Sequence, residues 1–151
     1  MKLKILFCLL LSGCTSSSPW HFDSIATGEP SFDSSRLVYQ TRDSLLEANL
    51  EFFYREGKVS AYVTSPARRF ERQAGAATTK ARLTVGSEAL EEELPLHAGQ
   101  MRVKLPDTWA QKAIDALKDG REIAIMVGVI DQTIQPEEFS ELFKKLQGPV
   151  L

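Results

Sequence analysis

The chain has 151 residues, 43% of them hydrophobic and 25% charged, and its 18 basic and 20 acidic side chains give a net charge of −2. A chain of this length predicts one domain, large enough to bury a core of its own. The slight acidic excess argues against nucleic acid as the principal partner, because domains that bind nucleic acid usually carry a marked basic excess.

Residues 1–13 have the pattern of a secretory signal peptide. Two lysines precede an apolar run, Ile5–Leu11, which is much shorter than the roughly 20 residues of a membrane-spanning helix. The run ends in Leu11-Ser12-Gly13-Cys14, which resembles the lipobox of bacterial lipoproteins. The resemblance implies cleavage between Gly13 and Cys14 and acylation of the Cys14 thiol, which then anchors the chain to a membrane. The alternative is an ordinary signal peptide in which Cys14 is incidental.

The lipobox also implies a location in the cell envelope. In Gram-negative lipoproteins an aspartate after the cysteine holds the protein in the inner membrane, and here that residue is Thr15. The resemblance therefore implies the periplasmic face of the outer membrane if the source is Gram-negative. With Cys8 removed and Cys14 acylated, no cysteine remains for a disulfide, a thiolate metal site or a cysteine nucleophile.

Residues 14–35 are predicted to be the acylated N-terminus and a flexible tether. Small polar residues, Gly28 and Pro30 break any regular period there. Trp20 and Phe22 interrupt the polar composition. Such an aromatic pair either docks onto the globular domain, which is the interpretation we prefer, or sits near lipid headgroups.

Residues 36–148 are predicted to form one globular domain, which begins with strands. Apolar and polar residues alternate with period two, and turn signals such as Glu56-Gly57 and Gly86-Ser87 separate the runs. The predicted strands of this part are Leu37–Gln40, Leu46–Tyr54, Val59–Thr64, Ala81–Gly86, Leu90–Leu96 and Met101–Leu105. Antiparallel pairing is the natural arrangement of such strands.

The period changes to about 3.6 after Pro106, which predicts an amphipathic helix that begins near Asp107 and is capped at Gly120. The following run, Ile123–Ile130, is apolar on both faces and predicts a central strand covered from two sides. A second helix is predicted from Pro136, with Glu137 and Glu138 in its first turn. Its apolar face comprises Phe139, Leu142, Phe143 and Leu146.

Together these elements predict a mainly β (α+β) domain. It is an antiparallel β-sandwich or a strongly curved sheet of about seven strands, with one helix before the last strand and one at the C-terminus. From Met101 to Ile130 the order strand, helix, Gly-Arg, strand resembles small periplasmic β-sandwich proteins of the invasion-associated locus B type. Many of those proteins carry cysteines that this domain lacks.

The sequence offers few groups for chemistry and predicts a protein that is not an enzyme, with no cofactor and no metal. His97 is the only histidine of the predicted domain, whereas a zinc site needs several nitrogen or sulfur donors. Glu91-Glu92-Glu93 indicates a solvated strand face, because consecutive strand residues point to opposite sides. No glycine-rich phosphate loop is present.

One basic cluster is a candidate site for an anion or a partner. Its members are Arg68, Arg69, Arg72, Lys80 and Arg82. Guanidinium groups recognise phosphate and carboxylate, which in an envelope belong to anionic lipids, lipopolysaccharide, peptidoglycan or an acidic partner protein. The alternative is a mobile loop, because residues 74–79 are all small alanine, glycine and threonine residues.

Two functions fit these features. The first is a noncatalytic binding or assembly module, anchored through lipid on Cys14, whose edge strands or arginines contact another envelope component. The second is a small periplasmic carrier of lipid or another apolar ligand. A carrier needs a hydrophobic cavity on the order of a few hundred Å³, whereas a module has a filled core and acts through its outer surface.

Overall fold

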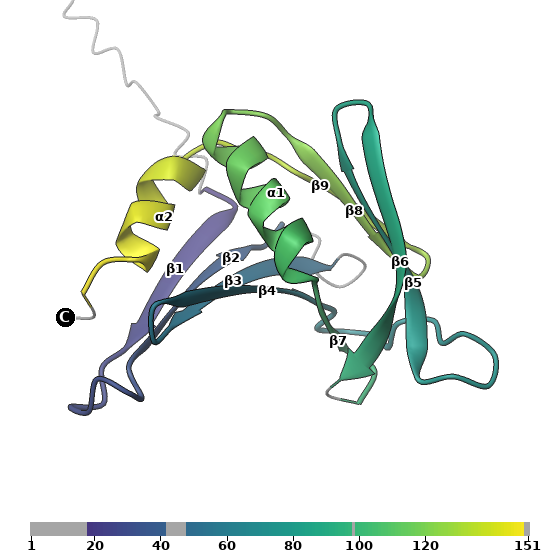
Figure 1. Cartoon of the computed structure of the whole chain (residues 1–151), viewed down its shortest axis with the longest axis horizontal. Coiled ribbons are helices and arrows are strands. Elements are labelled where there is room, and N and C mark those ends of the chain that lie inside the picture. The colour runs from purple at the N-terminus through teal and green to yellow at the C-terminus, as the bar shows by residue number, and fades with distance from the viewer. Residues whose placement is uncertain (1–17, 42–47, 98, 150–151) are drawn as a thin grey trace, which may run out of the picture.

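The computed structural model describes residues 18–41, 48–97 and 99–149, which form a curled antiparallel sheet with two helices on its concave side (Figure 1). The strands are β1 (Trp20–Ile25), β2 (Ser34–Tyr39), β3 (Asn49–Arg55), β4 (Lys58–Thr64), β5 (Thr78–Val85), β6 (Glu88–His97), β7 (Arg102–Lys104), β8 (Ile123–Val127) and β9 (Ile130–Ile134). The helices are α1 (Asp107–Lys118) and α2 (Phe139–Leu146). The sheet has the shape of a half-barrel.

The order of the strands in the sheet is β1-β2-β3-β4-β7-β6-β5-β8-β9. The first four strands form a meander, and β5, β6, β8 and β9 form the other half of the sheet. The short strand β7 joins the halves, because it pairs with β4 on one side and with the end of β6 on the other. Because β7 has only three residues, the sheet can bend sharply where this strand joins its two halves.

The core fills the space between the sheet and the helices. Trp20 of β1, Phe52 of β3 and two phenylalanines of α2, Phe139 and Phe143, form an aromatic cluster with ring centroids 5.0 to 6.3 Å apart. The remaining buried hydrophobic side chains come mainly from the inward positions of the strands and from one face of α1. The concave side of the sheet is therefore occupied by side chains of the chain itself.

Both ends of α1 follow the local sequence. At its start, the hydrogen bond and charge of Lys58, 3.0 Å away, hold the pKa of Asp107 below its usual range, and Lys104 adds to this effect. At its end, Gly120 has a φ of +73°, and the N–H groups of Gly120 and Arg121 donate to the carbonyls of Leu117 and Ala116. This pair of bonds is the Schellman motif, so the predicted glycine cap is confirmed.

The predicted helices are both present, with one adjustment. The helix predicted from Pro136 begins only at Phe139, because Glu138 has a φ of +64° and cannot continue a right-handed helix. Of the predicted apolar face, Phe139, Phe143 and Leu146 are buried and Leu142 is half-buried. Among the described residues no helix is long and apolar enough to cross a membrane.

The mainly antiparallel β architecture is confirmed in its curved-sheet form, but the described residues contain nine strands and not seven. One additional strand is β1, which lies within the segment predicted as a tether and pairs with β2 along its whole length. Its burial explains why it was missed: Trp20 is buried, but the other five residues are exposed and give no core signal. The sheet therefore begins at Trp20 rather than after Arg36.

The second additional strand arises because the predicted strand Ile123–Ile130 is two strands. Gly128, with a φ of +60°, and Val129 form a two-residue turn between β8 and β9. The prediction of a central strand covered from both sides is also wrong, because β8 lies next to the edge strand β9 and its Ala124 and Met126 are only half-buried. The apolar run concealed the turn.

Candidate binding surface

The residues between β4 and β5, 66–77, form a loop that we call the arginine loop. The Phe70 side chain, 3% exposed, anchors it in the core, and the Phe70 N–H donates to the Gln100 carbonyl at 2.8 Å. The Gln73 N–H donates to the Thr78 carbonyl at 2.8 Å, and the Arg68 N–H donates to Ser65 Oγ at 3.3 Å. The backbone of this loop is therefore held at several points.

The arginine loop also packs against the turn between β8 and β9. A Cβ atom on Gly128 would lie 3.2 Å from both the backbone N and the Cβ of Glu71. The Gly128 N–H donates to the Lys80 carbonyl at 2.8 Å, which fixes the turn beside the start of β5. This close approach needs a residue without a side chain.

The guanidinium groups of the loop are available for a ligand. Arg68, Arg69 and Arg72 are exposed, and none makes an ion pair with another residue that the structure describes. Arg72 Nε donates to the Ala76 carbonyl at 2.5 Å, which orients this side chain without neutralising it. The loop thus displays three positive charges on an anchored backbone.

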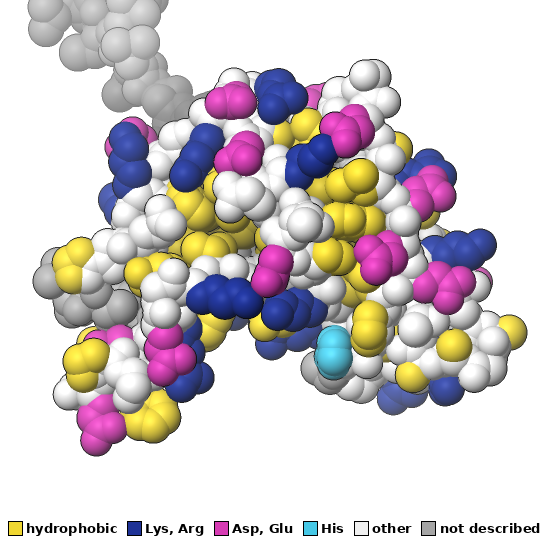
Figure 2. Space-filling model, in the orientation of Figure 1, with side chains coloured by type: hydrophobic (Ala, Val, Ile, Leu, Met, Phe, Trp, Pro, Cys, Tyr) yellow, Lys and Arg dark blue, Asp and Glu magenta, His cyan; other side chains and the backbone are white. Residues whose placement is uncertain are grey.

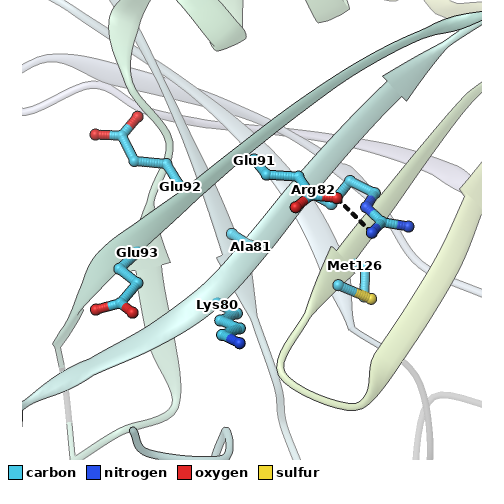
Figure 3. A pocket seen from close by; sticks show the side chains of 7 residues that line it. All are labelled: Lys80, Ala81, Arg82, Glu91, Glu92, Glu93 and Met126. Atoms are coloured by element: carbon cyan, nitrogen blue, oxygen red, sulfur yellow. Dashed lines mark ion pairs between the residues drawn. The ribbon is translucent and has the colours of Figure 1, made fainter.

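The other two basic residues of the predicted cluster lie on β5 and not in the loop. Arg82 forms an ion pair with Glu91 of β6, and Lys80 stands opposite Glu93 of the same strand. Figure 3 shows Arg82 and Glu91 joined across the two strands, with Met126 of β8 beside them. A cleft of about 320 Å³ opens here, lined by Lys80, Ala81, Arg82, Glu91, Glu92, Glu93 and Met126. Its mixed charges make it a weaker anion site than the loop.

A polar cluster that the sequence did not indicate lies on the outer face of β3, β4 and β7. The Arg102 guanidinium is 3.8 Å from the centroid of the Tyr62 ring and 3.9 Å from Glu51. Thr64 Oγ1 donates to the same Glu51 carboxylate at 2.8 Å. These residues become neighbours only through the strand register, and Arg102 Nε is buried without a hydrogen-bond partner among the described residues.

The remaining groups considered for chemistry are dispersed. His97 is exposed at the end of β6, opposite Arg102 of β7. Among residues 18–41, 48–97 and 99–149, no three His, Cys, Asp or Glu side chains are placed to hold a metal ion. Gly13 and Cys14, the predicted cleavage and acylation sites, lie outside these ranges.

No protein-family model, curated protein or solved structure significantly matches this chain. The arginine loop is the candidate site because it is positively charged, exposed and held in place by its backbone contacts.

Substitution of Gly128 by alanine is expected to lower the free energy of unfolding by about 2–4 kcal/mol, because left-handed strain adds to a clash with Glu71. Gly120→Ala is the matched control, since that glycine also has a positive φ but a Cβ there would meet nothing within 4 Å. It should cost only about 1–2 kcal/mol. Urea unfolding followed by circular dichroism measures both, and equal values would show that the loop does not press on the turn.

Proposed function

We propose that this chain is a lipid-anchored protein of a bacterial cell envelope that acts as a noncatalytic binding or assembly module. The lipobox-like Leu11-Ser12-Gly13-Cys14 supports the anchor, and the arginine loop supports the binding role. The observation that carries the proposal is the display of three exposed arginines, which form no ion pair with a described residue, on a backbone that Phe70 anchors in the core. A preorganised loop loses less conformational entropy when it binds.

The distance between the arginine loop and the N-terminal tether determines which envelope components the loop can reach. Trp20, at the start of the sheet, donates its indole N–H to the Gln135 carbonyl just after β9, while the loop contacts Gly128 just before β9. The extended chain between these points runs from Ile130 to Gln135, or about 17 Å. The six residues from Cys14 to Trp20 reach at most about 20 Å. A tether of this reach lets the loop meet lipid headgroups as well as anionic groups of peptidoglycan or of an acidic protein, so its binding is measured with both peptidoglycan and anionic vesicles.

The alternative of a small apolar-ligand carrier has less support. A carrier of this shape would hold its ligand between the sheet and the helices, where Trp20, Phe52, Phe139 and Phe143 pack against one another. The clefts found among the described residues are on the surface and are lined largely by charged or polar side chains. Solvent extraction that recovered a stoichiometric lipid from the purified domain would favour the carrier instead.

The binding role is tested with a charge-reversed variant. Replacing Arg68, Arg69 and Arg72 by glutamate is expected to weaken binding to purified peptidoglycan by roughly 100-fold or more, since each cation near an anionic surface contributes about 1 kcal/mol. The control variant reverses three other exposed cations, Arg55, Lys144 and Lys145, and changes the net charge equally. Cosedimentation with peptidoglycan and with anionic vesicles distinguishes the sources of anion, and equal binding by both variants would remove the loop as the site.

The anchor is tested separately by mass spectrometry of the mature protein. We expect a chain that starts at Cys14 and carries fatty acyl groups. A Cys14→Ser variant should appear in the soluble fraction. A mature chain that starts elsewhere, or that lacks the acyl groups, would contradict the anchor without affecting the binding test of the loop.

A further inference from the structure

Strand β6 is paired along its whole length on one side only. On that side Glu88 to Pro95 are in register with β5. On the other side β7 is in register only with Leu96 and His97. After β7 the chain turns away toward α1, and the Leu105 N–H donates to Ala61 of β4 instead of extending the pairing with β6. Most of β6 is therefore an edge, although the strand lies inside the order of the sheet.

The register identifies the backbone groups that are free on this edge. The Leu96 N–H donates to the Ala77 carbonyl at 2.9 Å, so every second residue before it, from Leu94 back to Glu88, bonds toward β5. The intervening residues Ala89, Glu91 and Glu93 direct their N–H and C=O groups away from β5. None of these three N–H groups has a partner among the described residues. They form a ladder with the repeat that an added strand requires.

An open cleft lies beside the start of this edge, where Glu88 is the residue of β6 that lines it. This cleft of about 490 Å³ lies between the β5–β6 hairpin and α1, lined by Val85, Glu88, Thr108, Gln111, Lys112, Asp115 and Arg121. The ion pair between Lys112 and Glu88 bridges it near the tip of the hairpin. Hydrophobic side chains are visible between α1 and β6 in Figure 2, and Leu90 and Leu96 on the inward face of β6 are only half-buried. An added strand would cover them.

The charges on β6 determine what kind of strand fits. Glu88, Glu91, Glu92 and Glu93 are all exposed, and Glu92 makes no ion pair with any described residue. A second copy of this edge would place carboxylates opposite carboxylates, which is destabilising, whereas lysines or arginines on the added strand would be stabilising. The acidic edge therefore disfavours pairing with the β6 edge of a second copy of the protein.

We propose that the free edge of β6 binds an extended, lysine- or arginine-rich segment of another protein, which adds as a strand between β6 and α1. The main chain of the segment bonds to Ala89, Glu91 and Glu93, its basic side chains face Glu91 and Glu93, and its alternate apolar side chains cover Leu90 on the opposite face. This site requires neither the lipid anchor nor the arginine loop, so it can fail or succeed independently of the proposed function.

Amide hydrogen exchange with a synthetic peptide tests the site. The probe alternates lysine with valine and threonine over seven residues, and the control peptide has glutamate in place of lysine. In the free protein we expect the amides of Ala89, Glu91 and Glu93 to exchange fast and those of Leu90, Glu92 and Leu94 to exchange slowly. The lysine peptide should slow exchange at the first three, and the glutamate peptide should not. Absence of protection at those amides at millimolar peptide would overturn the proposal, as would protection that arises from dimerisation of the protein alone.

Variants of β6 test whether the peptide binds at the free edge of this strand. Glu91→Pro removes an N–H that no ladder bond uses, so the fold should persist while the peptide no longer binds. Glu92→Pro removes a ladder bond to β5 and is the matched control, in which unfolding is expected. Should Glu91→Pro not fold, the double variant Glu91→Gln and Glu93→Gln decides, because both side chains lie on the face that the lysines would meet: it should bind the lysine peptide about tenfold or more weakly than the parent. Unchanged lysine-peptide binding in a folded variant of either kind would overturn the site.

Discussion

Replacing Trp20 by alanine is expected to lower the free energy of unfolding by about 3–5 kcal/mol, the usual effect of truncating a buried aromatic side chain. Trp20 is 4% exposed, its ring lies 4.9 Å from that of Tyr39 and 5.0 Å from that of Phe139, and its N–H donates to the Gln135 carbonyl at 3.0 Å. The variant loses both the packing and the hydrogen bond. Urea unfolding followed by far-UV circular dichroism gives the value, since the fluorophore itself is removed.

Two controls separate the contributions of Trp20. Trp20→Phe keeps most of the packing but leaves the Gln135 carbonyl without its donor, and should cost about 1–3 kcal/mol. Phe22→Ala, two residues along the same strand and 38% exposed, should cost less than about 1.5 kcal/mol. If Trp20→Ala were no more destabilising than Phe22→Ala, β1 would not belong to the cooperatively folding unit, and the boundary predicted near Arg36 would be the better description.

The elements that the sequence predicted correctly are those whose burial follows a period. The helix over Asp107–Lys118 is marked at both ends and places its apolar residues on one face, so local rules are sufficient. The strand β1 shows the limit of such rules, because one tryptophan supplies nearly all of its burial. The turn at Gly128 was missed for the opposite reason: the apolar residues on both sides of it concealed a glycine with positive φ.

The candidate sites depend on register, which a single sequence does not reveal. The pairing of Arg82 with Glu91 removes one cation from the predicted basic cluster, and it follows from the alignment of β5 with β6. Phe70 stands directly after Arg69 in the sequence, but its role as the anchor of the loop depends on a core built by distant strands. The free edge of β6 likewise depends on how short β7 is and where the chain turns after it.

Replacing Phe139 by alanine is the second substitution with a large expected effect, again about 3–5 kcal/mol of unfolding free energy. Phe139 is 0% exposed at the first turn of α2, and its ring lies 5.4 Å from that of Phe52 and 5.2 Å from that of Phe143. Together with Phe143, it packs α2 against the first half of the sheet. Phe32→Ala is the matched control, because this exposed phenylalanine should change stability by less than about 1 kcal/mol.

A double-mutant cycle of Trp20→Ala and Phe139→Ala then tests whether β1 and α2 stabilise the fold together. Contacting aromatic pairs contribute about 0.5–1.5 kcal/mol beyond their separate burial, so the double variant should lose less stability than the sum of the single variants by an amount in this range. A coupling of zero would mean that the two side chains act independently. Because β1 is one edge of the half-barrel and α2 lies against it, a measurable coupling implies that the C-terminal helix secures the strand that joins the domain to its N-terminal segment.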